Sequence, residues 1–301
     1  MAMAMHPSAT RQVVRLAWLV AGLALVATLA GLLAPDGADP STVQTVRGEE
    51  VELYGEGLYR RDSLFKGASN VGTDAITLAV AVPLLVWSTI ALRRGSPRGA
   101  VLLLGALAWF LYVYATYALS VAFNELFLVY VALASASFFA FVLLWRTIDP
   151  AALAAHVPDG VRRRTSALML ASALLTLLVW SLPLLAATFS GDAPKWLDSS
   201  STMVTDALDL AIITPSALLA GTLLRRNEPL GYLVAIVLLV LLLVLAPAII
   251  AQTISQLAVG IDFTPGEVIG PMAGFVVLGA IAAWCLIGLL RPLGHSEDGT
   301  A

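Results

Sequence analysis

The sequence predicts an all-α membrane protein, a polytopic bundle of about eight transmembrane helices. Of its 301 residues, 59% are hydrophobic and 12% are charged, which excludes an ordinary soluble domain. The apolar residues form continuous runs, whereas the strands of a membrane β-barrel would alternate with period two. Because backbone groups in lipid must bond to one another, each run of about 20 residues is predicted to be a helix.

Eight uncharged runs are the predicted spans. Arg11 and Arg15 precede the first run, so a cleaved signal peptide is an alternative there, but the run is longer than a signal core of about 7–15 residues. We therefore interpret it as an uncleaved helix. The sixth run is short, and its helix is predicted to begin near Val204, with Asp206 and Asp209 at its outer end. The runs are Leu16–Ala34, Ala75–Leu92, Gly99–Phe123, Leu126–Trp145, Thr165–Gly191, Leu210–Leu224, Pro229–Ile261 and Val268–Leu290.

The arginines predict the orientation in the membrane. Eight spans place both ends of the chain on one side, and the short connections on that side are rich in arginine, which the positive-inside rule makes cytoplasmic. We expect a multi-pass protein of the cell (plasma) membrane with cytoplasmic N- and C-termini. The lipid bilayer is its expected partner, with the arginines near anionic headgroups. The opposite face has fifteen acidic and five basic residues, so no nucleic-acid partner is expected.

An internal repeat divides the chain into two predicted halves of four helices each. A shift of 132 residues aligns Thr73–Gly99 with Thr205–Gly231, with eleven of twenty-seven positions identical, including Pro83 with Pro215. An even number of helices per half predicts a parallel repeat about an axis along the membrane normal. Convergence is the alternative, because Thr-Asp caps helices and Arg-Arg stops spans. The predicted segments are a cytoplasmic N-terminus 1–12, a first half 13–147 with an extracytoplasmic loop 35–72, a cytoplasmic linker 148–164, a second half 165–290 and a cytoplasmic tail 291–301.

Tyr54, Tyr59 and Phe65 in the loop 35–72 are typical of a segment at the membrane–water boundary, and a lid over the outer end of the bundle is the alternative. The interior prolines Pro83 and Pro215 are predicted to bend their helices at matched depths. A short helix is predicted near residues 151–156 of the linker.

Polar residues near the outer ends of the spans form the candidate binding site. Carboxylates and amides gathered at one level suit a hard cation or a small polar solute. The alternative is that Asp74 and Asp206 are helix N-caps and that Glu125 and Glu267 are solvated at turns. The candidates are Asp74, Asp206, Asp209, Asn124, Glu125, Gln252, Gln256 and Glu267.

Cofactor chemistry has little support in the sequence. One cysteine, Cys285, and three histidines in predicted cytoplasmic segments exclude a His/Cys metal site inside the membrane, and no catalytic residue is proposed. No cofactor is predicted.

Transport of a small solute or ion through an outer polar vestibule is the first functional hypothesis, although no charge lies at the midplane. A sensor, scaffold or assembly factor is the alternative, and a membrane enzyme is least favoured.

Three stretches carry a resemblance to a known family. Tyr54–Asp62, Thr73-Asp74 and Thr205–Leu210 resemble a family of uncharacterised prokaryotic multi-pass membrane proteins, from about Glu50 onward. The resemblance implies a membrane protein and supplies no activity, cofactor or catalytic residue.

Overall fold

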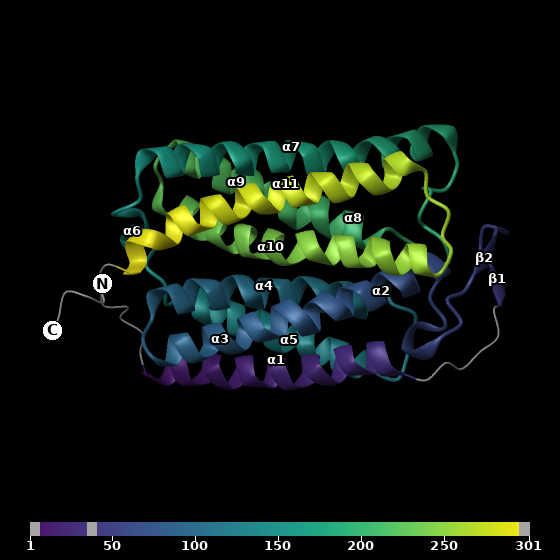
Figure 1. Ribbon diagram of the computed structural model, residues 1–301, viewed down its shortest axis with the longest axis horizontal. Helices are drawn as coiled ribbons and strands as arrows, with labels where there is room; N and C mark the ends of the chain where they lie inside the picture. The colour runs from purple at the N-terminus through teal and green to yellow at the C-terminus, as the bar shows by residue number, and fades with distance from the viewer. Residues whose placement is uncertain (1–6, 35–40, 295–301) are drawn as a thin grey trace.

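The computed structural model describes residues 7–34 and 41–294, and these form a bundle of long, roughly aligned helices with a small β-hairpin at one end (Figure 1). Within the described residues, eight helical segments are long and apolar enough to cross a membrane, which confirms the predicted number of spans. The protein is therefore an integral membrane protein of the multi-pass type.

The first half of the chain supplies four of these spans. The second span is one continuous helix of three parts, in which the π-helical turn η2 separates α2 from α3. The elements are α1 (Pro7–Leu33), β1 (Thr42–Gln44), β2 (Glu50–Glu52), the 3₁₀ turn η1 (Gly57–Tyr59), α2 (Leu64–Ile76), η2 (Thr77–Ala81), α3 (Val82–Arg93), α4 (Pro97–Ser120) and α5 (Phe127–Trp145). The strands β1 and β2 pair antiparallel.

The second half supplies the other four spans, and its second span is again split by a π-helical turn, η3. The elements are α6 (Pro150–Ala154), α7 (Asp159–Ser190), α8 (Val204–Leu208), η3 (Asp209–Ile213), α9 (Thr214–Arg225), α10 (Pro229–Ala258), α11 (Pro265–Leu290) and the 3₁₀ turn η4 (Arg291–Gly294). The helix predicted to start near Val204 does so, and the short linker helix α6 lies close to its predicted place.

The second span starts earlier than the sequence predicted. It begins at Leu64, so residues 64–72 of the predicted loop 35–72 are helical. The apolar run starts only at Ala75, because the first turns of α2 contain polar side chains such as Lys66 and Asn70. The hydroxyl of Ser63 caps this helix by accepting a hydrogen bond from the backbone N–H of Lys66.

Each π-helical turn ends two residues before a proline. Proline has no N–H to donate and its ring crowds the preceding turn, so a wider turn relieves the helix at that point. The Val82 N–H bonds to the carbonyl of Thr77, five residues earlier, and the Thr214 N–H bonds to that of Asp209. Pro83 and Pro215 thus mark matched irregularities in the two spans.

The two halves lie side by side, and α4 and α10 meet at the centre (Figure 1). Helices α7 and α11 lie on one side of this pair and α1 and α5 on the other. A Cβ atom on Gly105 of α4 would lie 2.4 Å from the Cβ of Val240 on α10, so glycine is what permits the close approach of these helices. The two ends of the bundle differ in charge. The arginine end carries Arg93, Arg94, Arg225 and Arg226, and the acidic end carries the β-hairpin and the segment 191–203.

Candidate functional site

Asp74 lies inside the bundle near its acidic end and is not a helix cap. It is the eleventh residue of α2 and is 1% exposed, so the N-cap interpretation of Asp74 is wrong. The Tyr59 hydroxyl donates to its Oδ2 at 2.6 Å, and the Tyr117 hydroxyl lies 3.3 Å from its Oδ1. Gly31 of α1 leaves room for this carboxyl, because a Cβ there would lie 1.8 Å from Oδ2.

Tyr59 comes from the loop that was predicted to lie at the membrane boundary. It is 1% exposed and its ring packs edge-on against Tyr117, so the boundary interpretation is wrong for this residue. Burial, and then the neighbouring Asp74 carboxyl, hold the pKa of Tyr59 well above its usual range. The phenol therefore remains a hydrogen-bond donor.

Asp209 has a different set of partners. The Tyr112 hydroxyl of α4 donates to its Oδ1 at 2.8 Å, and Trp180 Nε1 of α7 donates to its Oδ2 at 2.9 Å. Tyr112 and Tyr117 are five residues apart on α4, so their directions from the helix axis differ by roughly 140°. Asp74 and Asp209 consequently lie against different faces of α4, and among the described residues they share no hydrogen-bond partner.

Asp206 lies one turn before Asp209 and faces a cavity at the acidic end. The N-cap of α8 is Met203, so the N-cap interpretation of Asp206 is also wrong, although the side chain lies in the first helical turn. The cavity has a volume of about 360 Å³ and lies between α7, the segment 191–203 and α8. Its other lining residues include Leu184, Ser201 and Thr202.

The two glutamines join α10 to α2. Gln252 Nε2 donates to the Thr73 hydroxyl at 2.8 Å, and Gln256 Nε2 donates to the Ser69 hydroxyl at 2.6 Å. Gly72 lies between these contacts, and a Cβ on it would be 2.5 Å from the backbone of Gln252. These amides connect the two halves of the molecule by direct helix–helix bonds.

The remaining candidates lie at turns of the acidic end. Asn124 is buried and accepts from the Leu126 N–H, while Glu125 is exposed and pairs with Arg60 at 2.5 Å, which lowers the pKa of its carboxyl. Glu267 forms the capping box of α11 with Thr264 and also bonds to Lys195. The eight candidates are therefore divided among several groups of contacts and are not brought together in one site.

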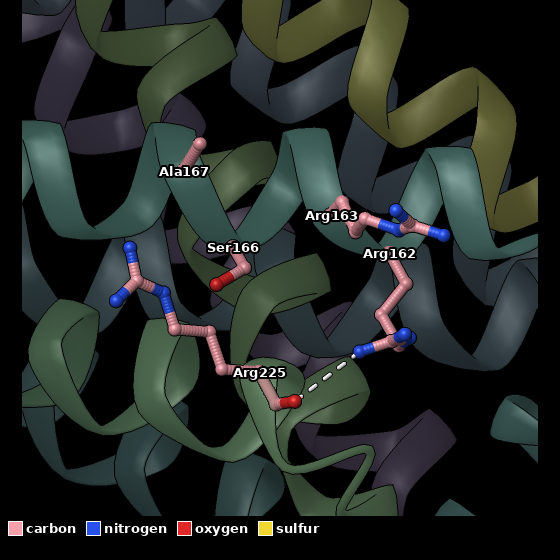
Figure 2. Close-up of a pocket in the computed structure, with 5 residues that line it drawn as sticks. All are labelled: Arg162, Arg163, Ser166, Ala167 and Arg225. Carbon is pink, nitrogen blue, oxygen red and sulfur yellow. Dashed lines mark hydrogen bonds between the residues drawn. The ribbon is translucent and has the colours of Figure 1, made fainter.

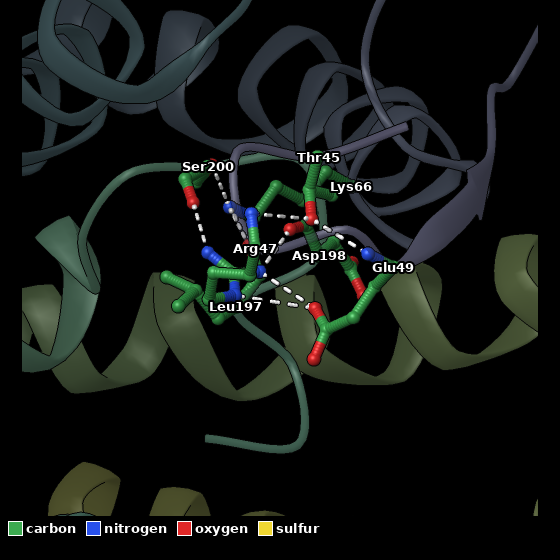
Figure 3. Close-up of polar contacts among 7 residues, drawn as sticks. All are labelled: Thr45, Arg47, Glu49, Lys66, Leu197, Asp198 and Ser200. Atoms are coloured by element: carbon green, nitrogen blue, oxygen red, sulfur yellow. Dashed lines mark hydrogen bonds and ion pairs between the residues drawn. The ribbon is translucent and has the colours of Figure 1, made fainter. Parts of the chain in front are cut away.

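A polar cap covers the acidic end and joins loops from both halves (Figure 3). Arg47 of the hairpin donates to the backbone carbonyl of Asp198 at 2.8 Å, and Ser63 donates to the Asp198 carboxylate at 2.7 Å. Lys66 bonds to Ser200. In the same region Asp62 is buried, with Oδ1 accepting from the Ala122 N–H, and burial raises the pKa of its carboxyl to about 7.

A second cavity, of about 390 Å³, lies at the arginine end between α7 and α9 (Figure 2). It is lined by Arg162, Arg163, Ser166, Ala167 and Arg225. Arg162 reaches across to the carbonyls of Leu224 and Arg225, at 3.0 and 3.3 Å, and bonds to Asp159. The two cavities lie at opposite ends of the seam that α7 makes with α8, η3 and α9.

Several residues of these groups were not singled out from the sequence. Trp180, Asp62 and Asp198 had no distinguishing motif, and Tyr59 was predicted only to be an aromatic residue of a segment at the membrane boundary. A buried acid requires hydrogen-bond donors. Phenol and indole side chains close to the predicted acids are therefore the signal that would have found some of these residues. Among the described residues, no group of three or more His, Cys, Asp or Glu is arranged to hold a metal ion.

Comparisons with protein-family models, curated proteins and solved structures give no match.

Proposed function

We propose that this integral membrane protein transports a small polar solute or an ion along the seam between α7 and the helix α8–η3–α9. The observation that carries the proposal is the presence of a cavity at each end of this seam, with the Asp209 carboxylate one turn inside the outer one. Asp209 of η3 is bound across the seam by Trp180 of α7 and, from outside the seam, by Tyr112 of α4. A rearrangement of these two bonds would open the carboxylate to either cavity.

The orientation follows from charge. We place the arginine end in the cytoplasm and the acidic end outside the plasma membrane, as the positive-inside rule requires. The outer cavity then presents the Asp206 carboxylate to the exterior, and the inner cavity presents Arg163 and Arg225 to the cytoplasm. An acidic entrance favours cationic or zwitterionic solutes over anions.

A parallel repeat of four plus four helices is part of the proposal. Its support is that equivalent elements recur 132 residues apart: η2 with η3, α3 with α9 and the start of α4 with that of α10. The loop residues Gly95 and Asn227, also 132 apart, both have a left-handed backbone, with φ of 80° and 57°. Helix capping and stop signals alone do not produce a shared π-helical turn in mid-span, so duplication accounts for more of the similarity than convergence does.

The test is flux in proteoliposomes with Asp209→Asn as the diagnostic variant. A panel of monovalent cations, amino acids and polyamines is screened by electrical recording on supported membranes, and one member is expected to give a protein-dependent current. Asp209→Asn is expected to reduce that current at least tenfold, because an amide lacks the charge that binds the solute. Glu125→Gln is the control, since this exposed carboxylate lies outside the seam, and it is expected to retain the current.

A non-catalytic sensor or scaffold is the second candidate, and the polar cap favours it. Residues 41–63 form a hairpin and turn that project from the acidic end, with Val46 96% exposed. A scaffold would give no current with any member of the panel. It would instead co-purify with a partner that is lost when the hairpin residues 42–52 are replaced by a short glycine-serine linker.

A further inference from the structure

The carboxyl of Asp74 is enclosed by four separate elements. Asp74 belongs to α2, Gly31 to α1, Tyr59 to η1 and Tyr117 to α4. The titratable side chains that face it are Tyr59, Tyr114 and Tyr117, together with Tyr130 of α5. All four are phenols, and both of its hydrogen-bond partners among the described residues are tyrosines. Within the part of the chain that the structure describes, no basic side chain bonds to this carboxyl, so no cation there balances a negative charge.

The protonation state of Asp74 depends on the hydrogen atoms that its neighbours can donate. Tyr59 donates to Oδ2 at 2.6 Å. The Tyr117 hydroxyl lies 3.1 Å from the backbone carbonyl of Asn70 and 3.3 Å from Oδ1 of Asp74, but it has a single hydrogen to donate. If it donates to the nearer carbonyl, Oδ1 faces the lone pairs of the phenol oxygen. A proton on Oδ1 turns this contact into a hydrogen bond and leaves every group satisfied.

The membrane environment also favours the protonated form of Asp74. An ionised carboxylate buried without a partner cation costs far more free energy than a neutral carboxylic acid. Asp209 differs from Asp74 in its donors. The indole N–H of Trp180, which can only donate, bonds to Oδ2, and the Tyr112 hydroxyl donates to Oδ1. Each oxygen of Asp209 thus has its own donor, and that carboxyl needs no proton to complete its bonds.

We propose that Asp74 is a proton-binding site, holding one proton at neutral pH between its own Oδ1 and the Tyr117 oxygen. Release of this proton would break the bond to Tyr117 and leave a charge facing four phenols. The carboxyl would then be expected to draw the Tyr117 hydrogen away from Asn70, changing the contact between α2 and α4. The further statement that this proton is the coupling ion rests on the transport function proposed above.

Infrared spectroscopy of the purified protein in detergent tests proton binding without any transport assay. At about pH 9, Asp62 is ionised, since the pKa of that carboxyl is about 7. The carbonyl stretching band of a protonated carboxyl is expected to persist at this pH, to disappear in Asp74→Asn and to remain in Asp209→Asn. Persistence of the band in Asp74→Asn, or its absence from the unaltered protein, would overturn the proposal.

Tyr117→Phe supplies a second test that does not depend on the folding of Asp74→Asn. It removes the acceptor of the proposed bond, so the band is expected to remain and to move to higher frequency, as for a weaker hydrogen bond. An unmoved band would show that Tyr117 is not the partner and would overturn the proposed position of the proton.

Flux measurements separate the coupling role from proton binding. With an identified solute, a pH gradient alone is expected to drive uptake, and Asp74→Asn is expected to reduce this uptake to background while leaving exchange of solute intact. The infrared band without any flux supports proton binding and rejects transport. Flux that is independent of pH and unchanged in Asp74→Asn supports transport and rejects the coupling role.

Discussion

At the scale of single residues, the acidic end of the bundle contains buried acids together with the groups that donate hydrogen bonds to them. Asp74, Asp206 and Asp62 are all less than 10% exposed. A carboxyl removed from water must replace its lost hydrogen bonds within the protein. Tyrosines supply the replacements for Asp74, and a backbone N–H supplies one for Asp62. The positions of these donors determine which acids face a cavity and which are enclosed.

Tyr59→Phe tests how much the hydrogen bond from Tyr59 to Asp74 stabilises the folded protein. Removing this hydroxyl leaves Oδ2 without its bond, and an unsatisfied buried group costs about 1–3 kcal/mol. We expect a clear decrease in Tm in detergent. Tyr114→Phe is the matched control, because the buried Tyr114 hydroxyl has no hydrogen-bond partner among the residues that the structure describes. Its Tm is expected to stay the same or rise, and equal losses in both variants would contradict the account.

The carboxyl of Asp62 makes the stability of the acidic end depend on pH. Its pKa is about 7 in the folded protein, raised by burial from the ordinary 3.8. Between these two values the folded state holds a proton that the unfolded chain has lost, so stability falls as the pH rises from about 4 to about 7 and then levels off. The total loss has an upper limit of about 4 kcal/mol.

Asp62→Asn is the corresponding variant. Because asparagine is neutral at every pH and its oxygen still accepts from the Ala122 N–H, we expect a flatter profile of Tm against pH between 5 and 8. Asp192→Asn, at an exposed position in the segment 191–203, is the control and is expected to keep the original slope. If the profiles of Tm against pH coincide for Asp62→Asn and the unaltered protein, the assignment of this pH dependence to Asp62 is refuted.

At the scale of elements, most spans were predictable because each carries an uninterrupted apolar run. Those runs end at arginines on one side, and the helix start at Val204 was inferred correctly from the shortness of its run. The start at Leu64 was not, since Lys66, Ser69 and Asn70 interrupt the hydrophobic pattern. Lys66 is satisfied by the cap and Ser69 by α10, and such tertiary contacts cannot be deduced from hydropathy.

Gly72→Ala tests the contact between α2 and α10. A Cβ at this position would lie 2.5 Å from the backbone of Gln252, which cannot move aside as a flexible side chain can. We expect a loss of about 1–3 kcal/mol, observed as a lower Tm. Gly22→Ala in α1 is the control, since nothing lies within 4 Å of its added Cβ, and it is expected to be neutral. A neutral result at both glycines would contradict the close packing described here.

At the scale of the whole molecule, the number of spans was predictable and their arrangement was not. Hydropathy does not mark α4 and α10 as the central pair, since their mean hydropathy values are 1.8 and 3.4 against 1.7–2.4 for the other spans. Lipid tails and a protein core attract apolar side chains about equally, so hydropathy does not distinguish the two positions. The candidate site was predictable only in part. The acids were recognised by their place near the outer ends of the spans, but their division between two faces of α4 depends on which tyrosines turn inward.

A bundle that crosses the membrane has its two ends in different compartments, and labelling of exposed cysteines tests this directly. Single cysteines are introduced at Val46 of the hairpin and, separately, at Glu228 before α10, both in a Cys285→Ser background and both at exposed positions. A membrane-impermeant maleimide is then applied to intact cells. We expect labelling at residue 46 in intact cells and at residue 228 only after the membrane is permeabilised. Labelling of both cysteines in intact cells, or of neither until permeabilisation, would contradict the account.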